Sequence, residues 1–347
     1  MKLKIGVIFG GKSGEHDVSL MSASNVIEVM DKNKYDIVKI GITKIGKWMI
    51  YTGDVLNIKD GSWEKDEENL IYEFSLFDHP MITPIDVFFP ILHGPNGEDG
   101  TVQGLLKIIG KPFVGCGVLA SSVGMDKVYS KILFENAGIP IGNYMPLTIA
   151  QWNANRDEMN IKIEEKLEYP FFVKPANMGS SVGISKVHNR DEMITGLEEA
   201  FTYDCKLILE KAIDCREVEC AVLGNQNPKA SVLGEIIPSQ EFYDYQAKYT
   251  DGDKSVLIIP AKLDHDTTEK IRDYAVKAFT SINGRGLSRV DFFIEKGTDK
   301  IFINEINTLP GFTNISMYPK LWEKTGISYE ELIEKLIQFA MEEHGVN

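Results

Sequence analysis

The chain has little cysteine and no long apolar run. Its four cysteines, Cys116, Cys205, Cys215 and Cys220, show neither C-x-x-C spacing nor the density of a disulfide scaffold. This pattern indicates reduced thiols and argues against a metal–thiolate centre. No apolar stretch reaches the roughly 18 residues of a membrane span, and the apolar run within residues 1–10 is too short for a secretory signal. We therefore expect a cytoplasmic protein with no membrane partner.

Positive charge is also in deficit, since the formal net charge is −14. Such a chain gains no counterion-release energy on nucleic acid or on an anionic membrane, so neither is expected as a partner. A local group of lysines can still form a positive cleft for a nucleotide. The 347 residues, 43% of them hydrophobic, are typical of a folded protein with two or three packed units.

The order of apolar segments predicts α/β architecture. A buried strand at residues 4–9 precedes a glycine turn and an amphipathic helix at 18–30, and further strands follow at 37–40 and 87–89. This alternation predicts a Rossmann-like parallel sheet through about residue 120. Later segments predict helices at 127–137 and 267–282 and strands at 171–174 and 207–209, with two more strands near the end.

One short motif points to a different class of protein. Gly6, four further residues and Gly11-Lys12-Ser13 match the phosphate-loop pattern of nucleotide hydrolases. That motif needs its spacer to wrap phosphates as a loop, whereas residues 7–9 have the character of a buried strand. A phosphate-loop hydrolase is therefore kept only as an alternative.

Two segments near the C-terminus predict a β-hairpin with functional side chains. Residues 287–295 and 300–307 alternate in character, and the turn between them is centred near Thr298. In that register Asp291 lies opposite Glu305, and Arg289 lies opposite Asn307. The side-chain period of two then places all four on one face of the sheet.

Two opposed carboxylates repel each other unless a cation or a proton lies between them. The oxygens of Asp291, Glu305 and Asn307 suit magnesium or manganese, and magnesium usually completes its shell with nucleotide phosphates. The alternative is a solvated polar face neutralised by Arg289.

Phosphate-binding groups are present elsewhere in the chain. Lys127 and Lys174 supply positive charge, and the glycines of residues 179–183 permit a loop of backbone N–H groups that can cradle phosphates. Each feature alone is commonly an ordinary surface lysine or turn. Together with the carboxylate pair, they indicate a nucleotide site.

Six segments in order carry a family resemblance: residues 9–19, 92–100, 125–127, 173–183, 304–313 and 316–319, reading FGGKSGEHDVS, LHGPNGEDG, MDK, VKPANMGSSVG, NEINTLPGFT and SMYP. They resemble the D-alanine–D-alanine ligases of the ATP-grasp superfamily over nearly the whole chain. The resemblance implies an N-terminal α/β unit (1–120) and a two-part ATP-grasp fold (121–211 and 212–347). It also implies a homodimer.

The resemblance further implies the ligands and their residues. ATP would be bound by Lys127, Lys174, Ser181, Glu210, Lys211, Ala212, Ile213, Glu217 and Lys248. Two Mg²⁺ or Mn²⁺ ions would be bound by Asp291, Glu305 and Asn307. D-alanine would be bound by Glu15, His93, Ser316 and Met317. Ser180 and Tyr249 would link to Glu15, while Arg289 and the Gly311 N–H would stabilise the oxyanion.

The implied reaction is the ATP-dependent joining of two D-alanines through an acyl phosphate, which supplies a dipeptide for peptidoglycan. Ligases that use D-serine or D-lactate as the second substrate are alternatives within the fold, and Lys248-Tyr249 argues against the lactate type. A non-catalytic nucleotide-binding module is an alternative from another class, but it gives no reason for the full set of charged residues.

Overall fold

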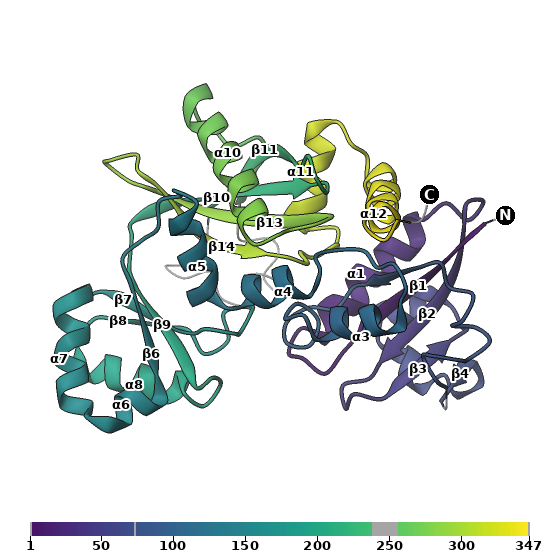
Figure 1. Cartoon of the computed structure of the whole chain (residues 1–347), viewed down its shortest axis with the longest axis horizontal. Helices are drawn as coiled ribbons and strands as arrows, with labels where there is room; N and C mark the ends of the chain where they lie inside the picture. The colour runs from purple at the N-terminus through teal and green to yellow at the C-terminus, as the bar shows by residue number, and fades with distance from the viewer. Residues whose placement is uncertain (1, 73, 238–255, 346–347) are drawn as a thin grey trace.

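The computed structural model describes residues 2–72, 74–237 and 256–345. Within these residues, three β-sheets occupy successive parts of the chain and meet around helices α4 (Val118–Met125) and α5 (Lys127–Asn136) (Figure 1). The mixed α/β architecture expected from the sequence is therefore confirmed.

The first sheet has the order β4-β3-β2-β1-β5. Its strands are β1 (Leu3–Gly10), β2 (Tyr35–Ile42), β3 (Trp48–Tyr51), β4 (Leu70–Ile71) and β5 (Val87–Pro90). Strand β1 is parallel to both β2 and β5, as the alternation of strand and helix predicts. Strands β3 and β4 join antiparallel, so the expectation of a wholly parallel sheet is wrong. The reason is that a short loop turns β2 directly back into β3, and the helical turns of residues 55–69 then bring β4 back beside β3, where a crossover to a parallel strand was expected.

The glycine motif at the start of the chain is not a phosphate loop. Residues 6–10 belong to β1 and pair with residues 38–42 of β2. Their backbone groups face a neighbouring strand within a sheet, so they cannot wrap a phosphate. The phosphate-loop alternative is therefore wrong, and the turn begins only at Gly10 and Gly11, whose φ angles are 86° and 104°.

The second sheet has the order β6-β9-β7-β8 and is antiparallel throughout. Its strands are β6 (Tyr144–Thr148), β7 (Phe171–Pro175), β8 (Ser185–Val187) and β9 (Lys206–Lys211). Helices α6 (Ile149–Ala154), α7 (Arg156–Leu167) and α8 (Arg190–Ala200) accompany it. The apolar residues of these helices and strands share one core, which leaves Lys174 and Glu210 to project from the sheet toward α5.

The third sheet has the order β12-β11-β10-β13-β14 and is also antiparallel. Its strands are β10 (Cys215–Leu223), β11 (Lys229–Ile237), β12 (Val256–Ile258), β13 (Leu287–Glu295) and β14 (Ile301–Asn307). Helix α10 (His265–Ser281) packs on one face, as the apolar period of residues 267–282 predicts.

The C-terminal hairpin pairs Asp291 with Glu305 and Arg289 with Asn307, so the predicted pairing is confirmed. The pairing between these residues and the turn is less regular than in the predicted hairpin. Nearer the turn, Phe292 pairs with Ile303, and the register shifts by one residue between the two pairs. The extra residue is Asn304, a β-bulge whose carbonyl accepts a hydrogen bond from Lys131 Nζ at 3.0 Å.

The C-terminal helices return to the first sheet (Figure 1). The remaining helical segments are α1 (His16–Val29), α2 (Val55–Lys59), α3 (Thr101–Ile109), α11 (Met317–Thr325), α12 (Tyr329–Glu343) and two 3-10 turns (Ser62–Lys65 and Glu67–Asn69). Tyr329 Oη and Asn25 Nδ2 both donate to the carbonyl of Phe312, at 2.8 and 3.2 Å. These bonds hold the loop after β14 against α1. Among the described residues, none of the helices combines the length and apolar character needed to cross a bilayer.

Candidate active site

Two cavities among the described residues share one wall. The larger cavity, with a volume of about 710 Å³, lies between the second and third sheets. The smaller cavity, of about 160 Å³, lies between the third sheet, Glu15 just before α1 and the loop after β14. Both are lined by Lys127, Met178, Gly179, Ser180 and Glu305. A group held in one cavity can therefore reach a group held in the other at this wall.

A buried carboxylate between two lysines lines the larger cavity, and we call Lys131, Glu210 and Lys174 the lysine cluster. Glu210 Oε1 lies 2.7 Å from Lys131 Nζ, and Glu210 Oε2 lies 2.8 Å from Lys174 Nζ. Burial by itself raises the pKa of Glu210, but the two ammonium groups outweigh it and lower the pKa to about 2. Burial likewise disfavours charged Lys174, yet Glu210 outweighs this effect and raises its pKa. The cluster keeps one positive charge in excess.

Lys127 lies at the shared wall because Asp126 caps helix α5. The Asp126 carboxylate accepts from the N–H groups of Val128 and Tyr129 at 3.1 and 3.3 Å and also binds Lys206. Lys127 Nζ donates to the Met178 carbonyl at 2.7 Å and lies 3.8 Å from Glu305 Oε2. The side chain thus joins the glycine loop to the carboxylate pair.

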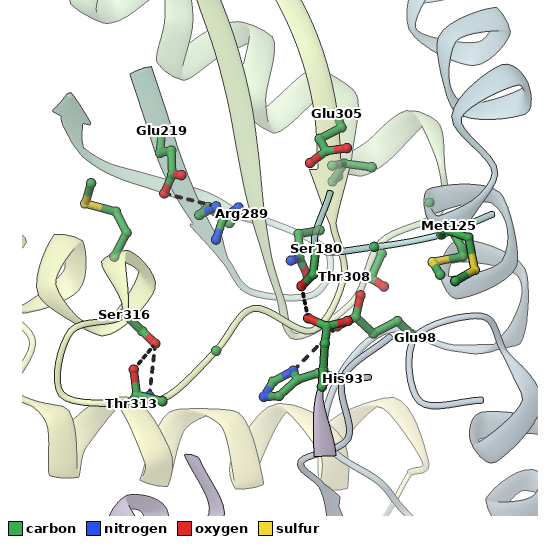
Figure 2. Close-up of a pocket in the computed structure, with 18 of the residues that line it drawn as sticks. His93, Glu98, Met125, Ser180, Glu219, Arg289, Glu305, Thr308, Thr313 and Ser316 are labelled. Atoms are coloured by element: carbon green, nitrogen blue, oxygen red, sulfur yellow. Dashed lines mark hydrogen bonds and ion pairs between the residues drawn. The ribbon is translucent and has the colours of Figure 1, made fainter. Parts of the chain in front are cut away.

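A largely buried arginine between two carboxylates lines the smaller cavity, and we call Glu219, Arg289 and Asp291 the arginine cluster. Arg289 binds both oxygens of Asp291 at 2.8 and 2.7 Å, and its Nε lies 3.0 Å from Glu219 Oε2 (Figure 2). Burial would lower the pKa of Arg289, but the charges of Asp291 and Glu219 outweigh it and raise the pKa. The cluster keeps one negative charge in excess.

Of the three oxygen donors expected to bind metal, only Glu305 lies at the shared wall. Glu305 faces both cavities, Asn307 faces the smaller one, and Asp291 lies opposite Glu305 in the sheet. Asn307 Oδ1 accepts from the Leu309 N–H at 3.0 Å. Arg289 neutralises Asp291 in this structure, as the solvated-face alternative proposed, although the side chains of Arg289 and Asp291 are only 18% and 14% exposed.

Glu15 and Ser180 connect the first sheet to the glycine loop. Ser180 Oγ donates to Glu15 Oε1, a contact between the residue that precedes α1 and the loop after β7. Ser180 and Ser181 hold φ angles of 50° and 61°, a backbone conformation that costs energy for residues other than glycine. Ser180 lines both cavities, whereas Ser181 lines only the larger.

His93 lines the smaller cavity together with Glu15 and is almost fully buried. Its Nδ1 lies 3.2 Å from the Leu309 carbonyl and 3.5 Å from Glu98 Oε1, and its Nε2 lies 3.2 Å from Ser22 Oγ. Burial lowers the pKa of His93, but the bond and charge of Glu98 outweigh it and raise the pKa. The histidine therefore ties the loop after β14 to α1.

The loop after β14 completes the smaller cavity. Ser316 Oγ lies 2.7 Å from Thr313 Oγ1 and accepts from the Thr313 N–H at 3.0 Å (Figure 2). Met317 begins helix α11, so backbone N–H groups of the first turn carry partial positive charge next to the cavity. A side chain at Gly311 would meet Ser316 Oγ at 2.8 Å, so the backbone there approaches closely.

The remaining predicted residues divide between the larger cavity and the undescribed part of the chain. Lys211, Ala212, Ile213 and Glu217 line the larger cavity and not the smaller one. Lys248 and Tyr249 lie outside the described residues.

The charged residues of the site that reading the sequence missed include Lys131, Glu219 and Glu98. Two of them had signals. Lys131 follows Lys127 by four positions, which places both on one helix face. Glu219 follows Glu217 by two positions in an alternating segment, which places both on one strand face. No local pattern distinguishes Glu98 from a surface acid.

Comparison with known proteins agrees with this geometry. Family models described as D-ala D-ala ligase N-terminus and D-ala D-ala ligase C-terminus match residues 4–116 and 133–338. D-alanine–D-alanine ligases of Thermoanaerobacter sp. (strain X514) and Acetivibrio thermocellus are each 51% identical to the chain. The alignments cover 99% and 100% of this chain, respectively, and 98% of each relative.

Solved structures show the same fold. The VanG D-Ala:D-Ser ligase from Enterococcus faecalis superposes with a TM-score of 0.87 at 38% identity, covering 98% of this chain and 100% of that one. The D-alanine-D-alanine ligase from Coxiella burnetii gives 0.86 at 34% identity, covering 99% and 95%. The matches make this protein a ligase with the ATP-grasp fold. More narrowly, the chain belongs to the D-alanine–D-alanine ligase family.

Proposed function

We propose that the protein joins two D-alanine molecules at the expense of ATP. The observation that carries the proposal is the wall shared by the two cavities, where Glu305 and Lys127 face both. The larger cavity has the size of a nucleotide site and an excess positive charge. The smaller one suits amino acids. Phosphoryl transfer between them then occurs at the wall.

The larger cavity holds ATP in this proposal. Lys127, Lys174 and Ser181 bind phosphate oxygens, while Glu210 keeps Lys174 charged and in place. The segment Lys211, Ala212 and Ile213 contacts the adenine, and Glu217 accepts hydrogen bonds from the ribose hydroxyls. Lysines held by a fixed carboxylate need little reorganisation when charge moves to the leaving phosphate.

The donor set fits magnesium or manganese, two ions in the proposed complex. Asp291, Glu305 and Asn307 offer oxygen ligands only, and the two opposed carboxylates leave a negative charge that a divalent cation neutralises. When bound, the metal spreads charge on the transferring phosphoryl group. Asp291 must exchange its contact with Arg289 to take part.

The smaller cavity holds the two amino acids. Glu15, steadied by Ser180, accepts hydrogen bonds from the ammonium of the first D-alanine, and His93 supports this wall. The carboxylate of that D-alanine attacks the γ-phosphorus of ATP, the bond from that phosphorus to the oxygen bridging the β-phosphate breaks, and an acyl phosphate and ADP are formed. The amine of the second D-alanine, whose carboxylate is bound by Ser316 and the Met317 N–H, then displaces phosphate. Arg289 and the Gly311 N–H bind the oxyanion of that step.

The wider assignments extend the same proposal. We divide the chain into an N-terminal unit (1–120), a central ATP-grasp unit (121–211) and a C-terminal ATP-grasp unit (212–347), and the parallel core β2-β1-β5 supports a Rossmann-like first unit. The protein is a cytoplasmic homodimer that supplies the dipeptide for peptidoglycan.

The test is an assay of purified protein with ATP, Mg²⁺ and D-alanine. Wild type forms dipeptide and phosphate together, and Glu305→Ala lowers the rate by about a hundredfold or more, because it removes the carboxylate at the shared wall. Glu295→Ala, on the same hairpin but outside both cavities, serves as the matched control. ATP hydrolysis that does not depend on D-alanine would contradict the proposal.

A D-alanine–D-serine ligase is the second candidate, because a solved D-Ala:D-Ser ligase has the same fold at 38% identity. A pocket made for a methyl group rejects one added hydroxyl only modestly. Competition between D-alanine and D-serine as the second substrate therefore decides between the two. We expect a higher kcat/KM for D-alanine.

A further inference from the structure

Asp291 has two competing uses, and this competition gives Glu219 a role. We infer that Glu219 is a positioning residue: it holds Arg289 at the smaller cavity when Asp291 releases the arginine to bind metal. The inference rests on the proposed function, since it takes Asp291 to be a metal ligand. It adds a residue that reading the sequence did not single out.

The sheet register places the three side chains in a row. Glu219 on β10 lies directly opposite Asp291 on β13, and Arg289 lies two residues from Asp291 on the same strand face. Arg289 Nε is 2.8 Å from Asp291 Oδ1 and 3.0 Å from Glu219 Oε2. The guanidinium thus lies within reach of two carboxylates at once, on neighbouring strands, and Figure 2 shows its contact with Glu219.

Charge explains why two carboxylates are needed. With both in place, the arginine cluster has a negative charge in excess, and Arg289 remains paired if one carboxylate turns away. The side chains of Arg289 and Glu219 are only 18% and 10% exposed. A buried guanidinium that lost its sole partner would be strongly destabilised. Without Glu219, Arg289 would therefore retain Asp291 and oppose metal binding.

Glu219 lies in a different cavity from the residues proposed to bind the nucleotide. Glu217, two residues earlier on β10, lines the larger cavity, whereas Glu219 lines the smaller cavity with Arg289. A change at Glu219 should therefore affect the chemical step and the metal more than ATP binding.

A double-mutant cycle on Mn²⁺ affinity tests the inference without measuring turnover. Mn²⁺ is titrated by electron paramagnetic resonance into protein saturated with the β,γ-imido analogue of ATP. Glu219→Gln is expected to weaken Mn²⁺ binding roughly threefold to tenfold, because Arg289 then competes harder for Asp291. In an Arg289→Met background, the same change should alter the affinity by less than about twofold. An equal loss in both backgrounds would overturn the inference, because Glu219 would then act on the metal directly.

Kinetics supply the second readout. Glu219→Gln should lower kcat about tenfold or more with KM for ATP within about twofold, because a misplaced Arg289 affects the oxyanion and leaves the nucleotide contacts intact. Glu219→Asp, which keeps the charge, should recover part of the loss. A rise in KM for ATP with kcat unchanged would overturn the inference.

Glu235→Gln is the matched control. Glu235 is as buried as Glu219, lies on the adjacent strand β11, and pairs with Arg216 at 2.7 Å outside both cavities. It should leave kcat and Mn²⁺ affinity unchanged, and thermal unfolding of every variant confirms folding. Absence of dipeptide from wild type would contradict the proposed function. The Mn²⁺ cycle still decides the coupling between Glu219 and Arg289 in that case.

Discussion

The lysine cluster and the arginine cluster share one arrangement, in which a charged side chain lies between two side chains of opposite charge. The signs of the charges are reversed between the two clusters. In the larger cavity, Glu210 lies between Lys131 and Lys174, so one positive charge is in excess. Beside the smaller cavity, Arg289 lies between Asp291 and Glu219, so one negative charge is in excess. Both are largely buried, and both have short contacts between charged atoms.

The difference shows how one site can receive a polyanion and a cation side by side. A buried cluster with unbalanced charge is costly unless a ligand completes it. The excess positive charge suits nucleotide phosphates, and the excess negative charge suits a divalent cation. The wall between them, with Lys127 3.8 Å from Glu305, is where the two ligands would meet.

Removing the centre of the arginine cluster should have the largest effect. Arg289→Met is expected to lower kcat for dipeptide formation by roughly 10²- to 10³-fold, because the oxyanion loses its charged donor. Affinity for the ATP analogue should stay within about threefold, since the lysine cluster is intact. Arg216→Met, also on the third sheet and paired with Glu235, is the control. If Arg289→Met weakened binding of the ATP analogue as much as it lowered kcat, the two clusters would not have separate roles in nucleotide binding and in chemistry.

Removing the centre of the lysine cluster should act on stability in a pH-dependent way. The folded-state pKa of Glu210 is about 2, below the ordinary 4.5. Its stabilisation is therefore present above pH 4.5 and is lost as pH falls toward 2, and it amounts to about 3 kcal/mol at pH 7.

Urea unfolding of Glu210→Gln and wild type should accordingly differ by about 3 kcal/mol at pH 7 and by less at pH 3. Glu198→Gln, at an exposed position, is the control. Its free energy of unfolding should differ from that of wild type by the same small amount at pH 7 and at pH 3. A difference that grows on acidification would contradict the assignment of Glu210 as a charged carboxylate.

The hydrogen bond between Ser180 and Glu15 tests how the shared wall contributes to binding of the first D-alanine. Ser180→Ala should raise KM for the first D-alanine roughly threefold to tenfold, because Glu15 loses a hydrogen bond that fixes its carboxylate. Ser180→Gly removes the same hydroxyl and relieves the backbone strain at a φ of 50°. Both variants should show the same KM. Recovery by glycine would indicate that loop strain matters more than the bond.

The smallest effect is expected at the exposed rim of the larger cavity. Asp214 pairs with Lys296 at 2.6 Å, but their side chains are 80% and 57% exposed. Asp214→Asn should shift Tm by about 1 °C or less, because solvent screens the pair. If Asp214→Asn lowered Tm as much as Glu210→Gln does, burial would not be the reason that the lysine cluster contributes more to stability than this exposed pair.

Much of the site could be predicted from local pattern. Asp291, Glu305, Arg289 and Asn307 were placed on one face because strand side chains alternate, and the pairing is confirmed. The bulge at Asn304 was not predicted, because it depends on Lys131 and the neighbouring strand rather than on the hairpin itself. The mixed first sheet was missed for a related reason: the direction of β3 and β4 depends on connections that propensity does not describe.

The sequence by itself determined the family, the apolar periods of most elements and the oxygen-rich carboxylate pair, since these depend on neighbours along the chain. Only the tertiary structure decided which charges become partners. Glu210 meets Lys131 and Lys174 across two strands and a helix, and Glu219 meets Arg289 across a sheet. Such pairings follow from strand order and helix packing, where residues far apart in the chain are brought within 3 Å of each other.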